Sequence, residues 1–108
     1  MSDIIVEKNP PQTRLDSLGV TKWATWEKEI SVFPWTFPEQ EIAYILDGEC
    51  LITPEGGETV SFGKGDLVTF PAGMVCRWEV VQPLRKHYQL EGSFLSRIYR
   101  RAKLALKL

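Results

Sequence analysis

The chain has 108 residues, of which 44% are hydrophobic and 25% are charged, and its formal net charge at pH 7 is −1. This composition is typical of a single folded domain and excludes a disordered chain. No apolar run approaches the roughly 18 residues that a membrane-spanning helix needs. The first residues resemble neither a signal peptide nor a transit peptide, so we expect a cytoplasmic protein, or a plastid protein in its processed form.

The charged residues are unevenly distributed along the chain. Residues 93–108 hold five basic side chains and no acidic one, whereas the other 92 residues hold 8 basic and 14 acidic side chains. The body of the chain therefore carries a net charge of −6. A surface with this charge is not suited to nucleic acid, and we expect no nucleic-acid partner.

The predicted elements begin with an N-terminal arm, residues 1–19, that contains one short helical turn. Two prolines precede this turn, and Gly19 stands where a helix often ends in a left-handed residue. The pattern then changes to short β-type runs separated by Pro and Gly turns. We expect strands over residues 20–30, 42–53, 59–62, 66–70, 74–81 and 84–90. Strands at this spacing, with no long helix between them, favour the all-β class and an antiparallel sandwich or barrel.

Alternation along two runs predicts which side chains face the interior. Cys76 shares one strand face with Trp78 and Val80, so we expect the Cys76 thiol inside the barrel. Two cysteines without a secretory signal do not indicate a disulfide scaffold, so the thiol is expected to be free. Glu41 shares a face with Ala43. A carboxylate among apolar neighbours needs a partner, water or a proton, because an unpaired buried charge costs several kcal/mol.

Residues 91–108 form the last predicted element, a basic amphipathic C-terminal helix. Apolar side chains recur at helical spacing between residues 95 and 106, and the basic side chains cover the remaining arc. We expect the apolar stripe to pack on the acidic barrel or across a dimer, because a helix of about 15 residues needs tertiary contacts to persist. The alternative is a peripheral contact of residues 93–108 with an anionic membrane.

Two motifs within residues 20–90 resemble those of the cupins, small β-barrels with paired motifs on facing strands. In the first motif a glutamate is followed by six residues and a glycine, and Glu41 and Gly48 bracket IAYILD in this way. In the second, Gly65, Pro71 and Gly73 match the spacing in GKGDLVTFPAG. The resemblance implies an antiparallel cupin barrel of the jelly-roll, RmlC-like type, and we expect a homodimer.

The runs YILDGE, GDLVTFPAGMVCRWEV and RKHY are similar to single-domain cupins grouped with ureidoglycine aminohydrolase and the ethanolamine-utilisation Q proteins. Metal-dependent cupins have two histidines before the glutamate and one in the second motif. Trp35, Phe37 and Cys76 stand in those three positions here. The resemblance therefore implies a degenerate site with no metal bound in the usual manner, and we expect no cofactor.

Glu41, Cys76 and the only histidine, His87, are the candidate catalytic residues. A thiolate near an imidazole and a carboxylate would resemble a nucleophile with its base and orienting group. The same three groups could instead hold an atypical metal with one open position. The structural alternative is that Cys76 packs as a small hydrophobe and that His87 is a hydrogen-bonded strand residue.

Four aromatic residues, Trp35, Phe37, Tyr44 and Trp78, are the candidate ligand-binding residues of the lumen. Such a lining suits a small and partly apolar ligand, whereas the alternative is a barrel filled by these side chains. Three functions follow from the sequence. The first is a module that binds a small molecule in the lumen; the others are an atypical or metal-independent enzyme and an interaction protein docked through its basic C-terminal helix.

Overall fold

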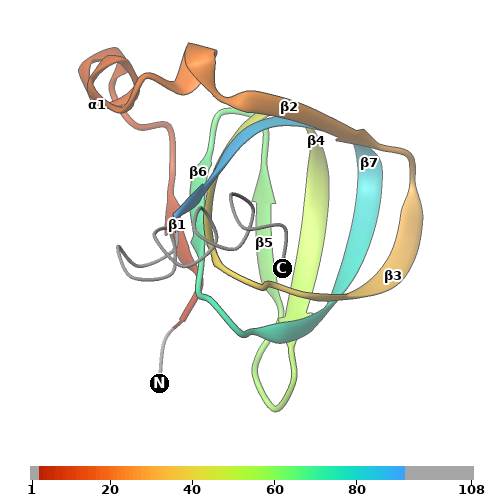
Figure 1. The fold of residues 1–108 in the computed structure, drawn as a ribbon. Coiled ribbons are helices and arrows are strands. Elements are labelled where there is room, and N and C mark those ends of the chain that lie inside the picture. Colours follow the sequence, from red (N-terminus) through yellow and green to blue (C-terminus); the bar gives the residue numbers. More distant parts are fainter. Residues whose placement is uncertain (1–2, 92–108) are drawn as a thin grey trace, which may run out of the picture.

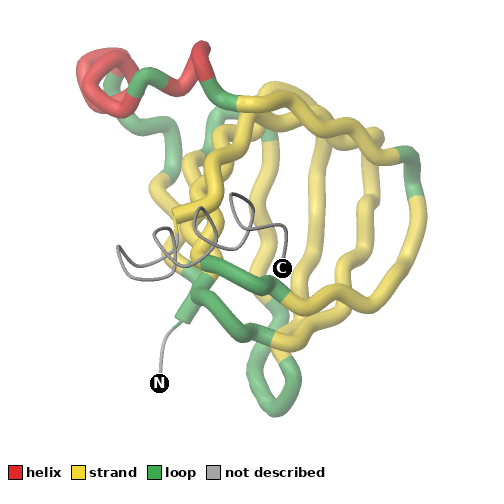
Figure 2. Tube along the Cα trace, viewed as in Figure 1, coloured by secondary structure: helices red, strands yellow, loops and turns green. Residues whose placement is uncertain are grey.

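The computed structural model describes residues 3–91, which form a curled antiparallel sheet with a short helix outside it (Figure 1). The elements are β1 (Ile5–Glu7), α1 (Gln12–Leu18), the 3₁₀ turn η1 (Val20–Lys22), β2 (Ala24–Lys28), β3 (Ser31–Thr36), β4 (Gln40–Pro54), β5 (Val60–Gly63), β6 (Leu67–Phe70) and β7 (Val75–Glu91). The predicted all-β class and antiparallel barrel are confirmed, as is the short helix before Gly19. In Figure 2 the strands enclose the barrel and both helical turns lie at its edge.

The long strands β4 and β7 pair with each other and form the spine of the seven-stranded sheet. Each strand changes its second neighbour partway along its length. The first part of β4 pairs with β6 and the later part with β5. The first part of β7 pairs with β3 and the later part with β2. These exchanges curl the sheet around one interior and bring residues from both spine strands into it.

A bulge in the spine explains why two predicted strands form one. Residues 74–81 and 84–90 were expected to be separate, yet both lie in β7. Pro83 has no amide hydrogen, but it is not one of the paired residues of the β4–β7 ladder. It lies where the register of the ladder shifts, so no hydrogen bond from its nitrogen is needed. Gly48 faces this point with φ +105, and a Cβ on it would lie 2.5 Å from the Pro83 carbonyl oxygen. Only glycine fits so close to the opposite backbone at this dihedral.

Two short strands were not among the predicted ranges. β1 lies within the predicted arm and pairs with β6, so this part of the arm belongs to the sheet. β3 contains Pro34, which is tolerated because β3 has a partner strand on one side only, β7. Apart from Glu91 at the end of β7, the predicted C-terminal helix lies outside the described residues.

The main core fills part of the barrel interior. The predicted alternation is confirmed, because Glu41 and Ala43 on β4 and Cys76, Trp78 and Val80 on β7 are all buried. Burial of each large apolar side chain contributes roughly 1.5–3 kcal/mol to the hydrophobic stabilisation of the fold. A smaller cluster, formed by Leu15, Val20 and Leu67, lies on the other face of the sheet, under α1 and η1. Within residues 3–91 the helices are too short and too polar to cross a bilayer.

Candidate functional site

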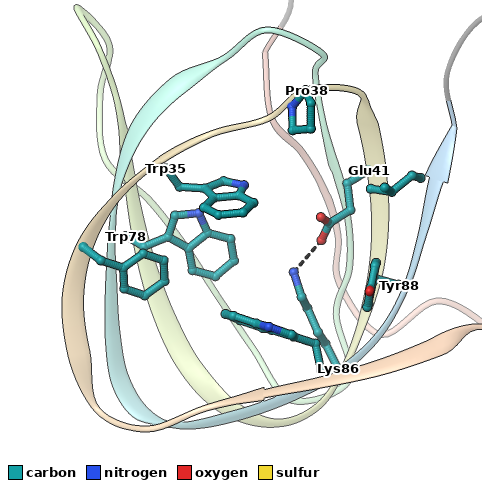
Figure 3. Close-up of a pocket in the computed structure, with 9 residues that line it drawn as sticks. Trp35, Pro38, Glu41, Trp78, Lys86 and Tyr88 are labelled. Atoms are coloured by element: carbon teal, nitrogen blue, oxygen red, sulfur yellow. Dashed lines mark hydrogen bonds and ion pairs between the residues drawn. The ribbon is translucent and has the colours of Figure 1, made fainter. Parts of the chain in front are cut away.

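A cavity of about 370 Å³ lies within the barrel and opens to its surface (Figure 3). Its lining is mostly apolar and includes five aromatic side chains. The apolar residues are Trp26, Phe33, Trp35, Pro38, Trp78, Tyr88 and Leu90. Two charged residues complete the lining, Glu41 from β4 and Lys86 from β7. We call this the lumen cavity.

Glu41 and Lys86 form a buried ion pair at the lumen cavity. Lys86 Nζ donates to Glu41 Oε2, and the two residues are only 4% and 6% exposed, respectively. Figure 3 shows the two side chains extended toward each other, and they come from the neighbouring strands β4 and β7. An isolated charge at this depth would cost several kcal/mol, so each residue supplies the partner that the other requires.

Four aromatic rings surround the ammonium group of Lys86. Nζ lies 5.0 Å from the ring centroids of Trp26 and Trp78, 5.6 Å from that of Tyr88 and 5.9 Å from that of Phe70. The negative faces of such rings attract a cation. They are nevertheless weaker acceptors than oxygen atoms, so the ammonium keeps donor capacity for an acceptor within the cavity.

Trp78 connects the cavity wall to the core. Its ring stacks on Phe33 with centroids 5.9 Å apart and meets Trp26 edge to face at 6.5 Å. The indole nitrogen of Trp78 is buried and lies next to the Cys76 thiol.

The four predicted ligand-binding residues occupy three different places. Trp35 and Trp78 line the lumen cavity, and Trp35 remains 47% exposed. Phe37 lies in the core and stacks on Phe70 with centroids 4.7 Å apart. Tyr44 packs against the cluster under α1, on the opposite face of the sheet. The structure therefore brings two of the four to the cavity.

Cys76 lies on the inner face of β7, as predicted, but its thiol is engaged by the backbone. Sγ donates to the carbonyl oxygen of Trp35 at 3.4 Å, and Cys76 is 5% exposed. Burial raises the pKa of Cys76 to about 11, and the neighbouring indole of Trp78 acts in the opposite direction with a smaller effect. The thiol is therefore neutral at pH 7, which does not suit a nucleophile.

His87 requires a correction to the predicted cluster. We expected it in the lumen with Glu41 and Cys76, but it lies on the other face of β7 and lines a separate cleft together with Tyr44. Its Nδ1 is 3.1 Å from Thr25 Oγ1. Strand alternation explains the placement, because the neighbouring Lys86 faces the lumen.

Lys86 is the functional candidate that the sequence analysis missed. A signal for it was present, since Lys86 lies between Leu84 and Tyr88 on the apolar face of its run. A lysine in that position requires a buried counter-charge, and Glu41 was the carboxylate predicted to need a partner.

Metal-dependent cupins hold a metal ion in the lumen of the barrel. The lumen residues of this chain do not fit such an ion. Trp35 and Phe37 offer no metal-binding side-chain atoms, and the Cys76 thiol donates to the carbonyl oxygen of Trp35. The Glu41 carboxylate is already neutralised by the Lys86 ammonium, which would repel a divalent cation. Within residues 3–91, no group of three or more His, Cys, Asp or Glu side chains is arranged to hold a metal ion.

Comparison with known proteins agrees with this fold. The chain matches the family model described as EutQ-like cupin domain over residues 15–88. A DUF861 family protein from Thermotoga maritima is similar at 46% identity with a TM-score of 0.80, covering 82% of this chain and all of that one.

Two EutQ proteins share the fold over a shorter length. The EutQ protein of Clostridium difficile is 31% identical with a TM-score of 0.54, and the match covers 59% of this chain and 50% of that one. A putative ethanolamine utilization protein Q from Salmonella typhimurium is 30% identical, also with a TM-score of 0.54, over 59% of this chain and 51% of that one. The search of curated proteins found no match. Because of the family match and the similarity to the Thermotoga protein, we conclude that the chain belongs to the EutQ-like cupin domain family.

Proposed function

We propose that this cupin binds a small, flat and largely apolar molecule in the lumen cavity. The observation that carries the proposal is a buried Glu41–Lys86 pair set in an open cavity of about 370 Å³ with aromatic walls. Small-molecule sites typically combine apolar walls with a few fixed polar groups that orient the ligand. The ion pair supplies these polar groups, and the rings of Trp26, Trp35 and Tyr88 supply surfaces for stacking.

The other functions weighed from the sequence have less support. An enzyme that uses Glu41, Cys76 and His87 together needs three groups that lie in different environments, on two faces of the sheet. Docking through residues 91–108 and formation of a homodimer remain predictions. The relatives' part in ethanolamine utilisation belongs to longer proteins, of which this chain covers about half.

The test is a titration with quinoline, a flat aromatic probe, followed through the indole N–H resonances of the four tryptophans. Trp26, Trp35 and Trp78 line the cavity, whereas Trp23 packs against the cluster under α1 and serves as an internal control. We expect saturable shifts for the three lining tryptophans and no shift for Trp23. Absence of saturable shifts for the three, or equal shifts for all four, would refute the proposal.

A matched pair of variants locates the binding. Trp35→Ala removes one wall of the cavity at a side chain that is 47% exposed, so it should weaken quinoline binding with little loss of stability. Val32→Ala changes an exposed residue of the same strand that lies on the opposite face, and it should leave binding unchanged. Equal effects of the two substitutions would show that the probe binds outside the lumen.

A further inference from the structure

The charges at the lumen cavity restrict the kind of ligand it can accept. The site is neutral overall, because the Glu41 carboxylate and the Lys86 ammonium cancel. A cationic ligand would be repelled by the Lys86 ammonium, which lies 5.0 Å from the centroids of the Trp26 and Trp78 rings that would otherwise attract it. An anionic ligand near Lys86 would also approach the Glu41 carboxylate, and like charges repel strongly in a poorly solvated cavity. The arrangement therefore favours a neutral ligand.

The hydrogen-bonding capacity of the pair restricts the ligand further. Lys86 Nζ has three N–H donors, and one is used on Glu41 Oε2. The Glu41 carboxylate retains Oε1, which can accept hydrogen bonds. Because the two residues are in contact, an available donor and an available acceptor lie side by side. A ligand that matches both, without separating the pair, must present an acceptor next to a donor.

The walls set the shape of that ligand. Trp26, Trp78 and Tyr88 surround the ion pair with ring surfaces, and Trp35 borders the same cavity. Flat conjugated rings gain most from such surfaces, because they stack and bury apolar area together. Shape, charge and hydrogen bonding thus converge on one chemical class.

Building on the function proposed above, we propose that the lumen cavity recognises a neutral, flat heterocycle whose edge carries a carbonyl beside a ring N–H, that is, a cyclic amide. The carbonyl oxygen accepts a hydrogen bond from Lys86 Nζ, and the ring N–H donates to Glu41 Oε1. The ion pair stays intact, so ligand binding leaves no charge without a partner.

The experiment compares five probes of similar size by calorimetry and by the indole N–H shifts. Quinolin-2-one carries the full cyclic amide edge, N-methylquinolin-2-one lacks the donor, and quinoline lacks both the carbonyl and the ring N–H. N-methylquinolinium is the cation and 2-naphthoate is the anion. We expect quinolin-2-one to bind at least about tenfold more tightly than each of the other four, because each lost hydrogen bond to a charged group weakens binding by this factor or more.

The variant that tests the mechanism removes both charges together. Glu41→Leu/Lys86→Met leaves no uncompensated charge, and it should bind quinolin-2-one no more tightly than it binds quinoline or N-methylquinolin-2-one. Val32→Ala is the control and should keep the preference. Tighter binding of the cation or the anion, or a preference that survives in the double variant, would overturn the cyclic amide class while leaving the proposed function in place. If none of the five probes shifts the lining tryptophans, the proposed function itself fails.

Discussion

The Glu41–Lys86 pair allows a quantitative prediction about stability. Lys86→Met keeps most of the side-chain volume but leaves the Glu41 carboxylate buried at 6% exposure without its counter-charge. Removing one partner of such a pair costs about 3–5 kcal/mol, a large share of the roughly 5–15 kcal/mol that stabilises a domain. With an m-value of about 2 kcal/mol per molar urea, the unfolding midpoint should fall by roughly 2 M. The cation–π contacts are already included in this loss, because all four rings share one ammonium.

The double variant Glu41→Leu/Lys86→Met should recover most of this stability, because neither charge remains to be solvated. We expect its free energy of unfolding to lie within about 1 kcal/mol of the wild type, or above it. Urea unfolding, followed by tryptophan fluorescence and far-UV circular dichroism, gives the four values of a double-mutant cycle. The reasoning is refuted if the two single substitutions cost less than about 1 kcal/mol each, or if their effects simply add.

Three further predictions concern the bulge, the thiols and metal content. Gly48→Ala places a Cβ 2.5 Å from a backbone oxygen at φ +105, whereas Gly56→Ala is the control, because φ is +73 there and nothing lies within 4 Å. The urea midpoint of Gly48→Ala should therefore fall far below that of Gly56→Ala, and equal midpoints would contradict this reasoning. Burial raises the pKa of Cys50 to about 12 and that of Cys76 to about 11, so a thiol reagent should label neither in native protein at pH 8 and both in urea. In the unfolded chain both thiols have a pKa near 9, so they ionise there at a lower pH than in the folded protein. The free energy of unfolding should therefore be unaffected by the two thiols below pH 9 and should decrease as the pH rises toward 12. Elemental analysis should find less than one manganese, iron or zinc ion per chain, because an ammonium already neutralises the lumen carboxylate.

Local patterns predicted the inner residues of the barrel, and long-range pairing explains what they missed. The alternation around Cys76 and Trp78 needs only neighbouring residues, so it could be derived from one strand. The placement of His87 needed the direction of the strand relative to the barrel. Its polar face was interpreted as lumen-facing, whereas polar residues of a one-sided sheet usually face solvent. Lys86 was missed because its counter-charge, Glu41, is 45 residues away in the sequence.

This separation also affects the order in which the fold can form during synthesis. The apolar inner face of β4 is complete by Pro54, but its spine partner β7 begins only at Val75 and ends at Glu91. As the chain emerges from the ribosome, β4 therefore has an unpaired edge and Glu41 has no counter-charge until Lys86 has been translated. Contacts of such long range make folding slow and leave strand edges open to association with other chains. The acidic residues of the body of the chain, which give it a net charge of −6, oppose that association by keeping nascent copies apart.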